Sequence, residues 1–332
     1  MKAITQDRIP VWIDCDPGHD DACAIVTAAY HPSMNLLGLS TVFGNTSLAQ
    51  TTENALSILE LIGKSIPVVP GMSQPLYRQT INGEYFHGPS GLGDTDLLPK
   101  PSQSALDGDV ADQMYKTLIA TPRGSAWLVA IGPLTNIAVL FTKYPKIQHH
   151  IRGLSIMGGV IGHGFCAGSS SATSPQGTWD PYIEFNILCD PESAHMVLSG
   201  THELRNKTIL VPLDLTHHVC CGKEIMDKIY GTTKVRLAFH ELLLFCQMSY
   251  AKHSHLKTGS PLHDPLAVAA ILADCDDPVD RIEFDGYNDR YNVEVLLEGK
   301  SAGRLLSPRP RMGSEFQKAW IPRNSGRCLS TV

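Results

Sequence analysis

Basic residues are scarce in this chain of 332 residues. Lysine and arginine together number 27, against 33 aspartate and glutamate residues, so the formal net charge is −6. Proteins that bind nucleic acid normally present basic patches, and this balance argues against such a partner. Charged residues make up only 18% of the chain and hydrophobic residues 43%. That is enough apolar material for a large buried core, which excludes a disordered chain.

Long hydrophobic runs are also missing. The apolar segment 126–131 falls far short of the roughly 20 residues that cross a bilayer, so no membrane partner is expected. The first ten residues lack the apolar stretch of a signal peptide. None of the nine cysteines belongs to a Cys-x-x-Cys pair, which argues against a zinc or redox motif. We therefore expect a cytoplasmic protein with reduced thiols.

Short apolar runs alternate with amphipathic segments along the chain. The runs typical of strands are residues 11–15, 36–43, 67–69, 126–131, 154–157 and 208–213. The segments typical of helices are residues 20–30, 47–62, 109–120, 134–141 and 191–198. This alternation predicts an α/β fold: a single domain over residues 1–332, with a mostly parallel open sheet and helices on both faces. Such sheets bind ligands at the carboxyl ends of their strands.

The second half of the chain is predicted to be more helical, and two long loops interrupt the pattern. Further helices are expected at residues 223–229, 235–251 and 265–273, and a late strand pair at residues 281–285 and 292–297. The long loops are residues 72–104 and 162–181. Long loops in a compact domain are usually functional or mobile. The second loop is rich in serine and glycine, so we expect it to be flexible without ligand.

Four carboxylates follow the first predicted strand, in the run Asp14-Cys15-Asp16-Pro17-Gly18-His19-Asp20-Asp21. Residues two apart in a strand share a face, so Asp14 and Asp16 are expected to point the same way. Gly18 permits a tight turn, and Asp20 or Asp21 can cap the next helix, but capping needs only one carboxylate. Crowded carboxylates repel one another unless a cation or strong donors stabilise them. The run therefore predicts a site for a hard cation, Mg²⁺ or Ca²⁺.

Two common acidic loops fit this run poorly. An EF-hand loop has glycine at its sixth position and glutamate at its twelfth, but counted from Asp14 these are His19 and Ile25. A haloacid-dehalogenase-type phosphotransferase resembles Asp-x-Asp-x-Thr/Val after its first strand, whereas the fifth residue here is Gly18. A metal-dependent phosphohydrolase with Asp14 or Asp16 as nucleophile stays open as an alternative.

The acidic run resembles the amino-terminal fingerprint of the nucleoside hydrolases, the inosine–uridine-preferring N-ribohydrolases. More motifs of that family follow in the expected order over about residues 9–300. They are Gly44-Asn45, His87-Gly88-x-x-Gly91-Leu92-Gly93, Ile131-Gly132-Pro133-Leu134-Thr135-Asn136-Ile137-Ala138, Met157-Gly158-Gly159, Glu184-Phe185-Asn186, Asp190-Pro191-Glu192 and His263-Asp264-Pro265-Leu266-Ala267. The resemblance implies hydrolysis of the N-glycosidic bond of ribonucleosides, uridine among them, to ribose and free base in nucleoside salvage. It also implies a homo-oligomer, a dimer or a tetramer.

The resemblance implies a Ca²⁺ cofactor. Its ligands would be the carboxylates of Asp16, Asp21 and Asp264 and the main-chain carbonyl of Thr135, with waters completing six to eight oxygens. Asp16 would also be the general base for the attacking water held by the cation. Asp264 could also cap the helix that follows it, because Asp-Pro at a helix start is typical of an N-cap followed by proline. The same pattern at Asp190 predicts a cap alone.

The implied substrate contacts begin with the ribose hydroxyls. Asp20 and Asn45 would bind the 2′- and 3′-hydroxyls, Asn186 the 3′-hydroxyl and Glu184 the 5′-hydroxyl. Buried groups that bind a hydroxyl are left unpaired when it is missing, so weak activity on 2′-deoxyribonucleosides is expected.

Two histidines are implied at the leaving base. His263 would give the base a proton, a task that suits histidine near neutral pH. His87 would contact the base or the ribose. Tyr250, on the helix before His263, is expected either to face the base or to belong to the core. The pairs at 149–150 and 217–218 are expected to be surface or loop residues.

The chain departs from the family pattern before Glu184. The stretch 178–183 lacks the asparagine that family members usually carry there for the 5′-hydroxyl. Asp180 or Trp179 is expected to replace this contact unless it is lost, and Trp179 has two further interpretations, base stacking and surface packing. The departure affects substrate range. A nucleoside-binding protein that has lost turnover is a further alternative.

Overall fold

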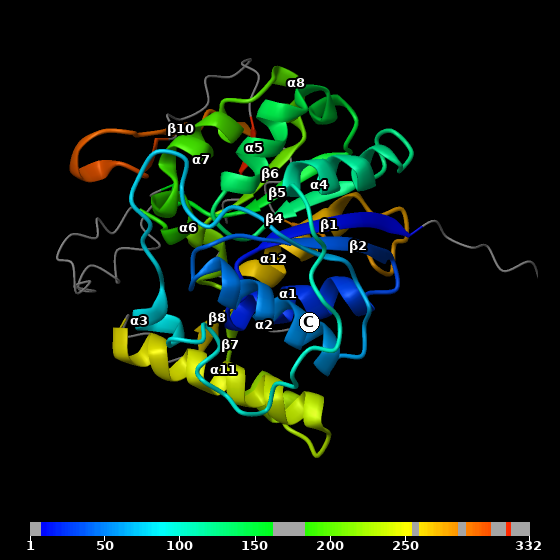
Figure 1. The fold of residues 1–332 in the computed structure, drawn as a ribbon, viewed down its shortest axis with the longest axis vertical. Helices are drawn as coiled ribbons and strands as arrows, with labels where there is room; N and C mark the ends of the chain where they lie inside the picture. Colours follow the sequence, from blue (N-terminus) through cyan, green and yellow to red (C-terminus); the bar gives the residue numbers. More distant parts are fainter. Residues whose placement is uncertain (1–7, 162–182, 254–258, 285–289, 307–316, 320–332) are drawn as a thin grey trace, which may run out of the picture.

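A parallel β-sheet forms the centre of the molecule (Figure 1). This computed structural model describes residues 8–161, 183–253, 259–284, 290–306 and 317–319. Six parallel strands lie in the order β3 (Val68–Pro70), β2 (Met34–Thr41), β1 (Ile9–Cys15), β4 (Trp127–Ala130), β5 (Gly153–Met157) and β6 (Thr208–Val211). Beyond β6 lie β12 (Gln317–Ala319), which is parallel to it, and β9 (Arg290–Tyr291), which is antiparallel to β12. The predicted α/β fold with a mostly parallel sheet is confirmed.

Helices cover both faces of the sheet, as predicted (Figure 1). One layer consists of α1 (His19–Tyr30), α2 (Leu48–Leu61) and α12 (His263–Ala270). The other consists of α4 (Val110–Ile119), α5 (Thr135–Lys143) and α7 (Pro191–Leu198). In β1, Val11 and Ile13 pack into the first core, whereas Trp12 packs into the second. Both faces are buried, which explains why the strands read as continuous apolar runs.

The other described helices are shorter or lie beside the site. They are α3 (Glu84–His87), α6 (Phe185–Cys189), α8 (His202–Asn206), α9 (Leu213–Thr216), α10 (Lys223–Ile229), α11 (Lys234–His253), η1 (Pro145–His149), η2 (Ile271–Asp274) and η3 (Gly299–Ser301). Helix α3 lies inside the predicted loop 72–104. The predicted loop 162–181 falls outside the described residues. Within the described chain, no helix is both long and apolar enough to span a membrane.

The prediction of a late strand pair was wrong in part. Residues 281–284 are not a strand, because their backbone is held by the turns before them: the N–H of Arg281 donates to Asp277 O and that of Ile282 to Leu272 O. Within 292–297 only β10 (Glu294–Val295) forms, and its antiparallel partner is β11 (Leu305–Leu306). A second short pair joins β7 (Cys220–Cys221) to β8 (Ser260–Pro261).

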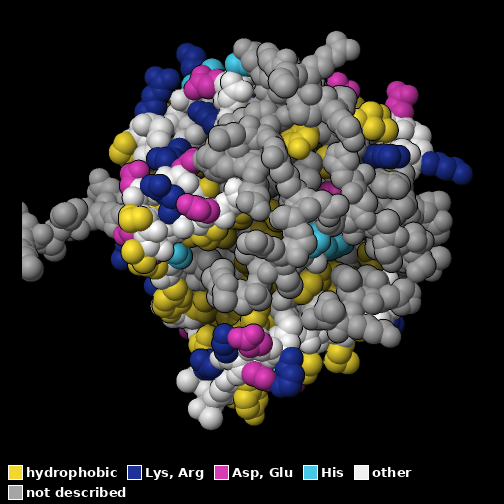
Figure 2. All heavy atoms as spheres, turned by 180° about the vertical axis from the view of Figure 1, so that it is seen from behind, with side chains coloured by type: hydrophobic (Ala, Val, Ile, Leu, Met, Phe, Trp, Pro, Cys, Tyr) yellow, Lys and Arg dark blue, Asp and Glu magenta, His cyan; other side chains and the backbone are white. Residues whose placement is uncertain are grey.

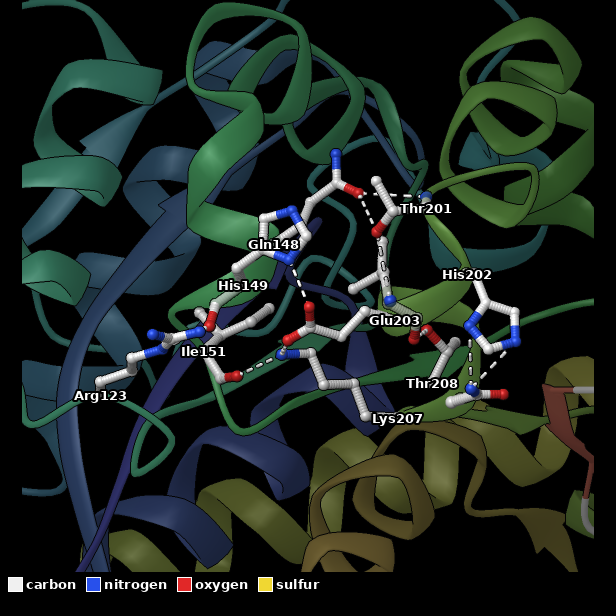
Figure 3. Close-up of polar contacts among 11 residues, drawn as sticks. Arg123, Gln148, His149, Ile151, Thr201, His202, Glu203, Lys207 and Thr208 are labelled. Carbon is white, nitrogen blue, oxygen red and sulfur yellow. Dashed lines mark hydrogen bonds and ion pairs between the residues drawn. The ribbon is translucent and has the colours of Figure 1, made fainter.

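The amino ends of the parallel strands lie opposite the ends that carry the predicted site, and they hold a polar network of their own. At the amino ends of β5 and β6, a polar network links η1 to α8 (Figure 3). Gln148 accepts hydrogen bonds from the N–H and hydroxyl of Thr201, while Glu203 pairs with both His149 and Lys207. Glu203 and His149 are about half exposed, so water screens this network and its effect on stability is small.

On the face seen in Figure 2, side chains of the two charge signs are interspersed over the described part of the surface. Neither sign forms a continuous area on the described part of this face.

The carboxyl ends of the strands form a crevice where the strand order reverses. Strand β1 is flanked by β2 on one side and by β4 on the other, and the helices that follow β1 and β4, α1 and α5, lie on opposite faces of the sheet. Open α/β sheets bind ligands at such a switch point. The acidic run begins in the last residues of β1 and continues into α1, and the motif containing Thr135 follows β4, so both reach this crevice.

Candidate active site

A cavity of about 240 Å³ opens at the carboxyl ends of the strands. Seven of the predicted site residues line it: Asp20, Asn45, His87, Glu184, Asn186, His263 and Asp264. No lysine or arginine is present among the described residues that line it. A wall rich in carboxylates without a fixed cation attracts cationic groups and repels phosphate.

The other three predicted site residues, Asp16, Asp21 and Thr135, are at most 1% exposed. Asp21 holds the turn between β1 and α1, since its carboxylate accepts the N–H of Gly18 at 2.9 Å and that of Asp16 at 3.2 Å. The capping role expected within the acidic run therefore falls on Asp21. Its carboxylate belongs at the same time to an acidic cluster.

Asp20, Asp21 and Asp264 each place one carboxylate oxygen within 4.8 Å of the others. This cluster contains two of the predicted metal ligands, Asp21 and Asp264. It also contains Asp20, for which ribose binding was predicted, and it does not include Asp16. The expected N-cap role of Asp264 was wrong, because α12 begins at His263 and so places Asp264 inside its first turn. Its carboxylate instead shares a hydrogen bond with that of Asp21.

Asp16 is fixed beside this cluster with one oxygen free. Its Oδ2 accepts the backbone N–H of Asn45 at 2.8 Å, whereas Oδ1 is buried without a partner among the described residues. The Asn45 amide donates to the carbonyl of Asp16 and to Asp21 Oδ2. Asn45 therefore joins the ends of β1 and β2, and an orphaned carboxylate oxygen marks a position where a cation or a water proton would be accepted.

Gly44 and Gly132 make room for the carboxylate of Asp16. A Cβ atom built on Gly44 would lie 2.1 Å from Asp16 Oδ2, and one built on Gly132 would lie 2.6 Å from Oδ1. Both distances are far below van der Waals contact, so neither position tolerates a side chain while Asp16 keeps its place.

Replacing Gly44 by alanine is expected to displace Asp16 and to lower activity by about 100-fold, because small misplacements of reacting groups are costly. The variant's kcat and melting temperature check this. Gly63→Asn is the matched control: Gly63 has φ +65°, which asparagine tolerates, and open space around it. Normal turnover by Gly44→Ala would contradict the assigned position of Asp16.

Burial raises the pKa of every carboxyl group in the acidic run and of Asp264. The pKa of Asp14 rises to about 7, that of Asp20 to about 6 and that of Asp21 to about 7. The pKa values of Asp16 and Asp264 are also raised, by burial first and then by neighbouring carboxylates. The N–H groups of His263 and Asp264, at the start of α12, partly offset the shift at Asp20. A hard divalent cation fits this donor set, because it would replace the protons.

Asp14 lies behind the site rather than in it. It is fully buried, and its Oδ1 accepts hydrogen bonds from the Ser40 hydroxyl and, at 2.8 Å, from Asn136 Nδ2. The Asn136 Oδ1 accepts the N–H of Met72, which ties the start of the long loop 72–104 to the same network. Asp14 does not line the cavity, and, unlike the carboxylate of Asp16, its carboxylate bonds none of the described residues that do, so the structure does not favour it as a nucleophile for phosphate esters.

Thr135 is anchored by a buried carboxylate. Its hydroxyl donates to Asp190 Oδ2 at 2.7 Å. Asp190 caps α7 through the N–H of Ser193 at 3.0 Å, which confirms the predicted cap. It also accepts the N–H of Leu76. Asp190 therefore holds the start of α5 and the long loop together, a role that local sequence did not reveal.

Glu184 and Asn186 are placed by α6. The Glu184 carboxylate caps this helix through the N–H of Asn186 at 2.8 Å, and it also accepts the N–H of Gly159 at 3.0 Å. The Asn186 amide donates to the carbonyl of Ile131 at 3.0 Å. Both residues line the cavity, and part of their hydrogen-bonding capacity serves the fold. The proposed 5′-hydroxyl contacts of Trp179 and Asp180 lie outside the described residues.

His263 lies between two hydroxyl groups. Its Nδ1 is 2.6 Å from Thr216 Oγ1, and its Nε2 is hydrogen-bonded to the Tyr250 hydroxyl. Tyr250 lines the cavity, so it faces the site as one of its two interpretations predicted. Burial lowers the pKa of His263 well below its usual value, and the nearby His217 lowers it further. The ring is therefore neutral, and both of its nitrogens are hydrogen-bonded to hydroxyl groups, those of Thr216 and Tyr250.

Two further histidines take part that sequence reasoning missed. His217, expected to be a surface or loop residue, lies in the turn after α9, where it lines the cavity with its ring 5.5 Å from that of His263. His19 contacts His87, with their Nδ1 atoms 3.1 Å apart. The predicted surface position of His149 is confirmed, since it is about half exposed. His19 stands inside the acidic run, but only the long-range contact with His87 gives it a place in the site.

The family model of the inosine-uridine preferring nucleoside hydrolases matches residues 11–323. The chain belongs to this family. It is therefore an N-glycosyl hydrolase of the nucleoside hydrolase class. Uridine nucleosidase of Saccharomyces cerevisiae is 36% identical over 275 residues, covering 81% of this chain and 77% of that protein. Pyrimidine-specific ribonucleoside hydrolase RihA of Citrobacter koseri is 35% identical over 266 residues, covering 80% and 79%.

Solved structures of nucleoside hydrolases share the fold. The purine-preferring ribonucleoside hydrolase of Gardnerella vaginalis superposes with a TM-score of 0.77 at 24% identity, covering 96% of this chain and 95% of that one. An inosine-guanosine nucleoside hydrolase superposes with a TM-score of 0.75 at 23% identity, covering 94% and 93%. These similarities support the fold of this nucleoside hydrolase. At under 25% identity they do not indicate which base it prefers.

Proposed function

We propose that this nucleoside hydrolase cleaves pyrimidine ribonucleosides, uridine among them, with a Ca²⁺ ion in its acidic cluster. The observation that carries the proposal is the unpartnered Asp16 Oδ1 beside the cluster of Asp20, Asp21 and Asp264. Support for the base comes from relatives named for uridine or pyrimidine substrates. The cellular context we infer is a homo-oligomer that serves nucleoside salvage in the cytosol.

The cation would be held by Asp21 and Asp264, together with Asp16, Asp20 and the carbonyl of Thr135 as further oxygen donors. Carboxylate and carbonyl oxygens are the ligands that Ca²⁺ prefers, and the spacing within the acidic cluster lets one ion contact several of them. When bound, Ca²⁺ supplies Lewis-acid polarisation of water and of sugar hydroxyls.

Asp16 acts as general base in this mechanism. Its Oδ2 is fixed by the N–H of Asn45, so the free Oδ1 is the atom that takes a proton from the attacking water. Burial and neighbouring carboxylates raise the pKa of Asp16, which makes the carboxylate a stronger base. Water attack at C1′ passes through an oxocarbenium-like transition state, and the surrounding carboxylates stabilise its positive charge.

The ribose and the base are held by opposite parts of the cavity. Asp20, Asn186 and Glu184 supply acceptors and donors for the sugar hydroxyls. The leaving base lies toward His87 and the Tyr250–His263 pair. Because the His263 ring is neutral and bonded to Tyr250, the Tyr250 hydroxyl is the group that can donate a hydrogen bond to the departing base, and His263 holds that hydroxyl in place.

Base release from a panel of nucleosides tests this function. We expect uridine and cytidine to be cleaved faster than inosine and adenosine. Cleavage of 2′-deoxyuridine should be at least about 100-fold slower in kcat/KM, since a missing hydroxyl leaves buried site groups unpaired. UMP should be inert, because its phosphate would enter a cavity that carries the carboxylates of Asp20, Glu184 and Asp264 and no lysine or arginine among its described lining residues. Phosphate release from UMP without base release from any nucleoside would overturn the proposal.

A further inference from the structure

His19 has no task in the mechanism above, yet its ring is completely buried. It stacks on His87 with ring centres 5.2 Å apart and planes 20° from parallel. It also stacks on Phe245, with centres 5.1 Å apart and planes 13° from parallel. The three rings come from α1, α3 and α11, so His19 joins the acidic run to the helices that form the base side of the cavity.

The contact between His19 and His87 constrains where their protons lie. Their Nδ1 atoms are 3.1 Å apart, which is a hydrogen bond between two ring nitrogens. One nitrogen must carry a proton and the other a lone pair, because two N–H groups would clash and two lone pairs would repel. The pair therefore has two possible arrangements, with the proton on His19 or on His87.

The remaining nitrogen of His19 selects one arrangement. His19 Nε2 is buried and has no partner among the described residues. If His87 donated, His19 would carry its proton on Nε2, as a buried N–H without an acceptor. Orphaned buried N–H groups are rarer in proteins than buried acceptors lacking a donor. The proton of His19 consequently lies on Nδ1, and His19 donates to His87.

We propose that His19 is a positioning residue that fixes His87 in its Nε2–H tautomer, so that His87 can only donate a hydrogen bond within the cavity. A neutral imidazole that accepts at Nδ1 must carry its own proton on Nε2. His87 lines the cavity, and this N–H is directed to an acceptor on the nucleoside, a base carbonyl or a ribose oxygen. The nature of that acceptor rests on the proposed function, whereas the tautomer does not.

Close packing around His87 limits which hydrogen-bond donors can reach its Nδ1. A Cβ atom on Gly18 would come within 2.8 Å of this nitrogen, so the turn before α1 packs directly against it. The backbone of His87 is fixed as well: its N–H donates to Gly83 O at 3.0 Å, and its carbonyl accepts the N–H of Gly93 at 2.9 Å. With the backbone held on both sides, the hydrogen bond from His19 sets the orientation of the ring.

The test compares His19→Phe with His19→Asn. Phenylalanine keeps the ring stack but has no donor, whereas asparagine keeps an N–H donor near the position of Nδ1 and loses the stack. The tautomer of His87 is read from ¹⁵N chemical shifts of the ligand-free protein, assigned by difference with His87→Gln. Kinetics on uridine and melting temperatures are measured on the same variants, and Phe245→Leu removes the second stacked ring alone.

We expect the Nε2–H tautomer of His87 in the wild type, in His19→Asn and in Phe245→Leu. In His19→Phe the Nδ1–H form should appear, and kcat should fall by about 10- to 100-fold, in the range found for lost outer-shell partners. Its KM should change little, because the lost interaction acts in the transition state. The His19→Asn variant should restore most of kcat.

An Nδ1–H form of His87 in the wild type would overturn the proposal. So would a His19→Phe variant that loses kcat while keeping the Nε2–H form, because His19 would then act only through packing. If the wild type released no base from any nucleoside, the proposed function would fail, while the tautomer measurement would still decide the role of His19.

Discussion

Replacing Asp16 by asparagine is expected to lower kcat for uridine by about 10²- to 10⁴-fold, the range that general bases contribute. Asparagine matches the shape of aspartate and still accepts the N–H of Asn45, but it cannot take a proton from water. Substrate binding is made mainly by other groups, so KM should stay close to that of the wild type. Steady-state kinetics of base release measure both constants.

Asp96→Asn is the control for this variant, because Asp96 is exposed and lies outside the cavity. We expect Asp16→Ala to bind nucleoside in equilibrium dialysis without releasing base, which would separate binding from turnover. A wild-type protein that binds nucleoside without releasing base would instead be a binding protein. If Asp16→Asn retained wild-type kcat, the base would have to be another carboxylate of the cluster.

Removal of the metal is expected to abolish activity and to lower the melting temperature by about 5–10 °C near pH 7.5, since a tightly bound ion stabilises the folded state by a few kcal/mol. Without a cation, the carboxylates of Asp20, Asp21 and Asp264 repel one another in a buried place. Chelation followed by differential scanning fluorimetry and a base-release assay tests this. Added Ca²⁺ should restore both properties.

The stability of the metal-free protein should depend on pH in a defined direction. Burial raises the pKa of Asp20 to about 6 and that of Asp21 to about 7, from an ordinary value of 3.8. Between pH 4 and pH 7 the folded state therefore binds more protons than the unfolded state. The free energy of unfolding falls as pH rises through this range and levels off above it. With Ca²⁺ bound, the carboxylates are already deprotonated, so this decrease should disappear.

Two results would contradict the metal site. One is full activity after exhaustive chelation, with a melting temperature unchanged by Ca²⁺. The other is a melting temperature of the metal-free protein that rises between pH 4 and pH 7. Because metal binding displaces protons, calorimetry in buffers of different ionisation enthalpy should also detect proton release on Ca²⁺ binding. Asp264→Asn should reduce that release and weaken Ca²⁺ binding.

Much of the fold was predictable because its signals are local. Alternating apolar runs predicted all six parallel strands, since each strand is buried on both faces and carries few polar residues. The late strand pair could not be predicted in the same way. Residues 281–284 have strand-like composition, but their backbone hydrogen bonds go to the turns at Asp277 and Leu272. Tertiary context overrides β-propensity in such a segment.

The sequence by itself determined that a cluster of carboxylates follows β1 at the carboxyl edge of a parallel sheet. The run from Asp14 to Asp21 has four carboxylates, and a helix cap needs only one. A run that connects a strand to the helix after it always lies at the carboxyl end of that strand. Strand periodicity and charge repulsion are local properties, and a single chain is enough to show them.

Only the tertiary structure decided which members of that cluster work together. It buried Asp14 behind the site, grouped Asp20 with Asp264 from the far end of the chain, and left one oxygen of Asp16 unpaired. It also set His19 against His87, which lies 68 positions away. Hydrogen-bond partners and burial depend on contacts between distant segments, and those contacts exist only once the sheet and its helices have packed.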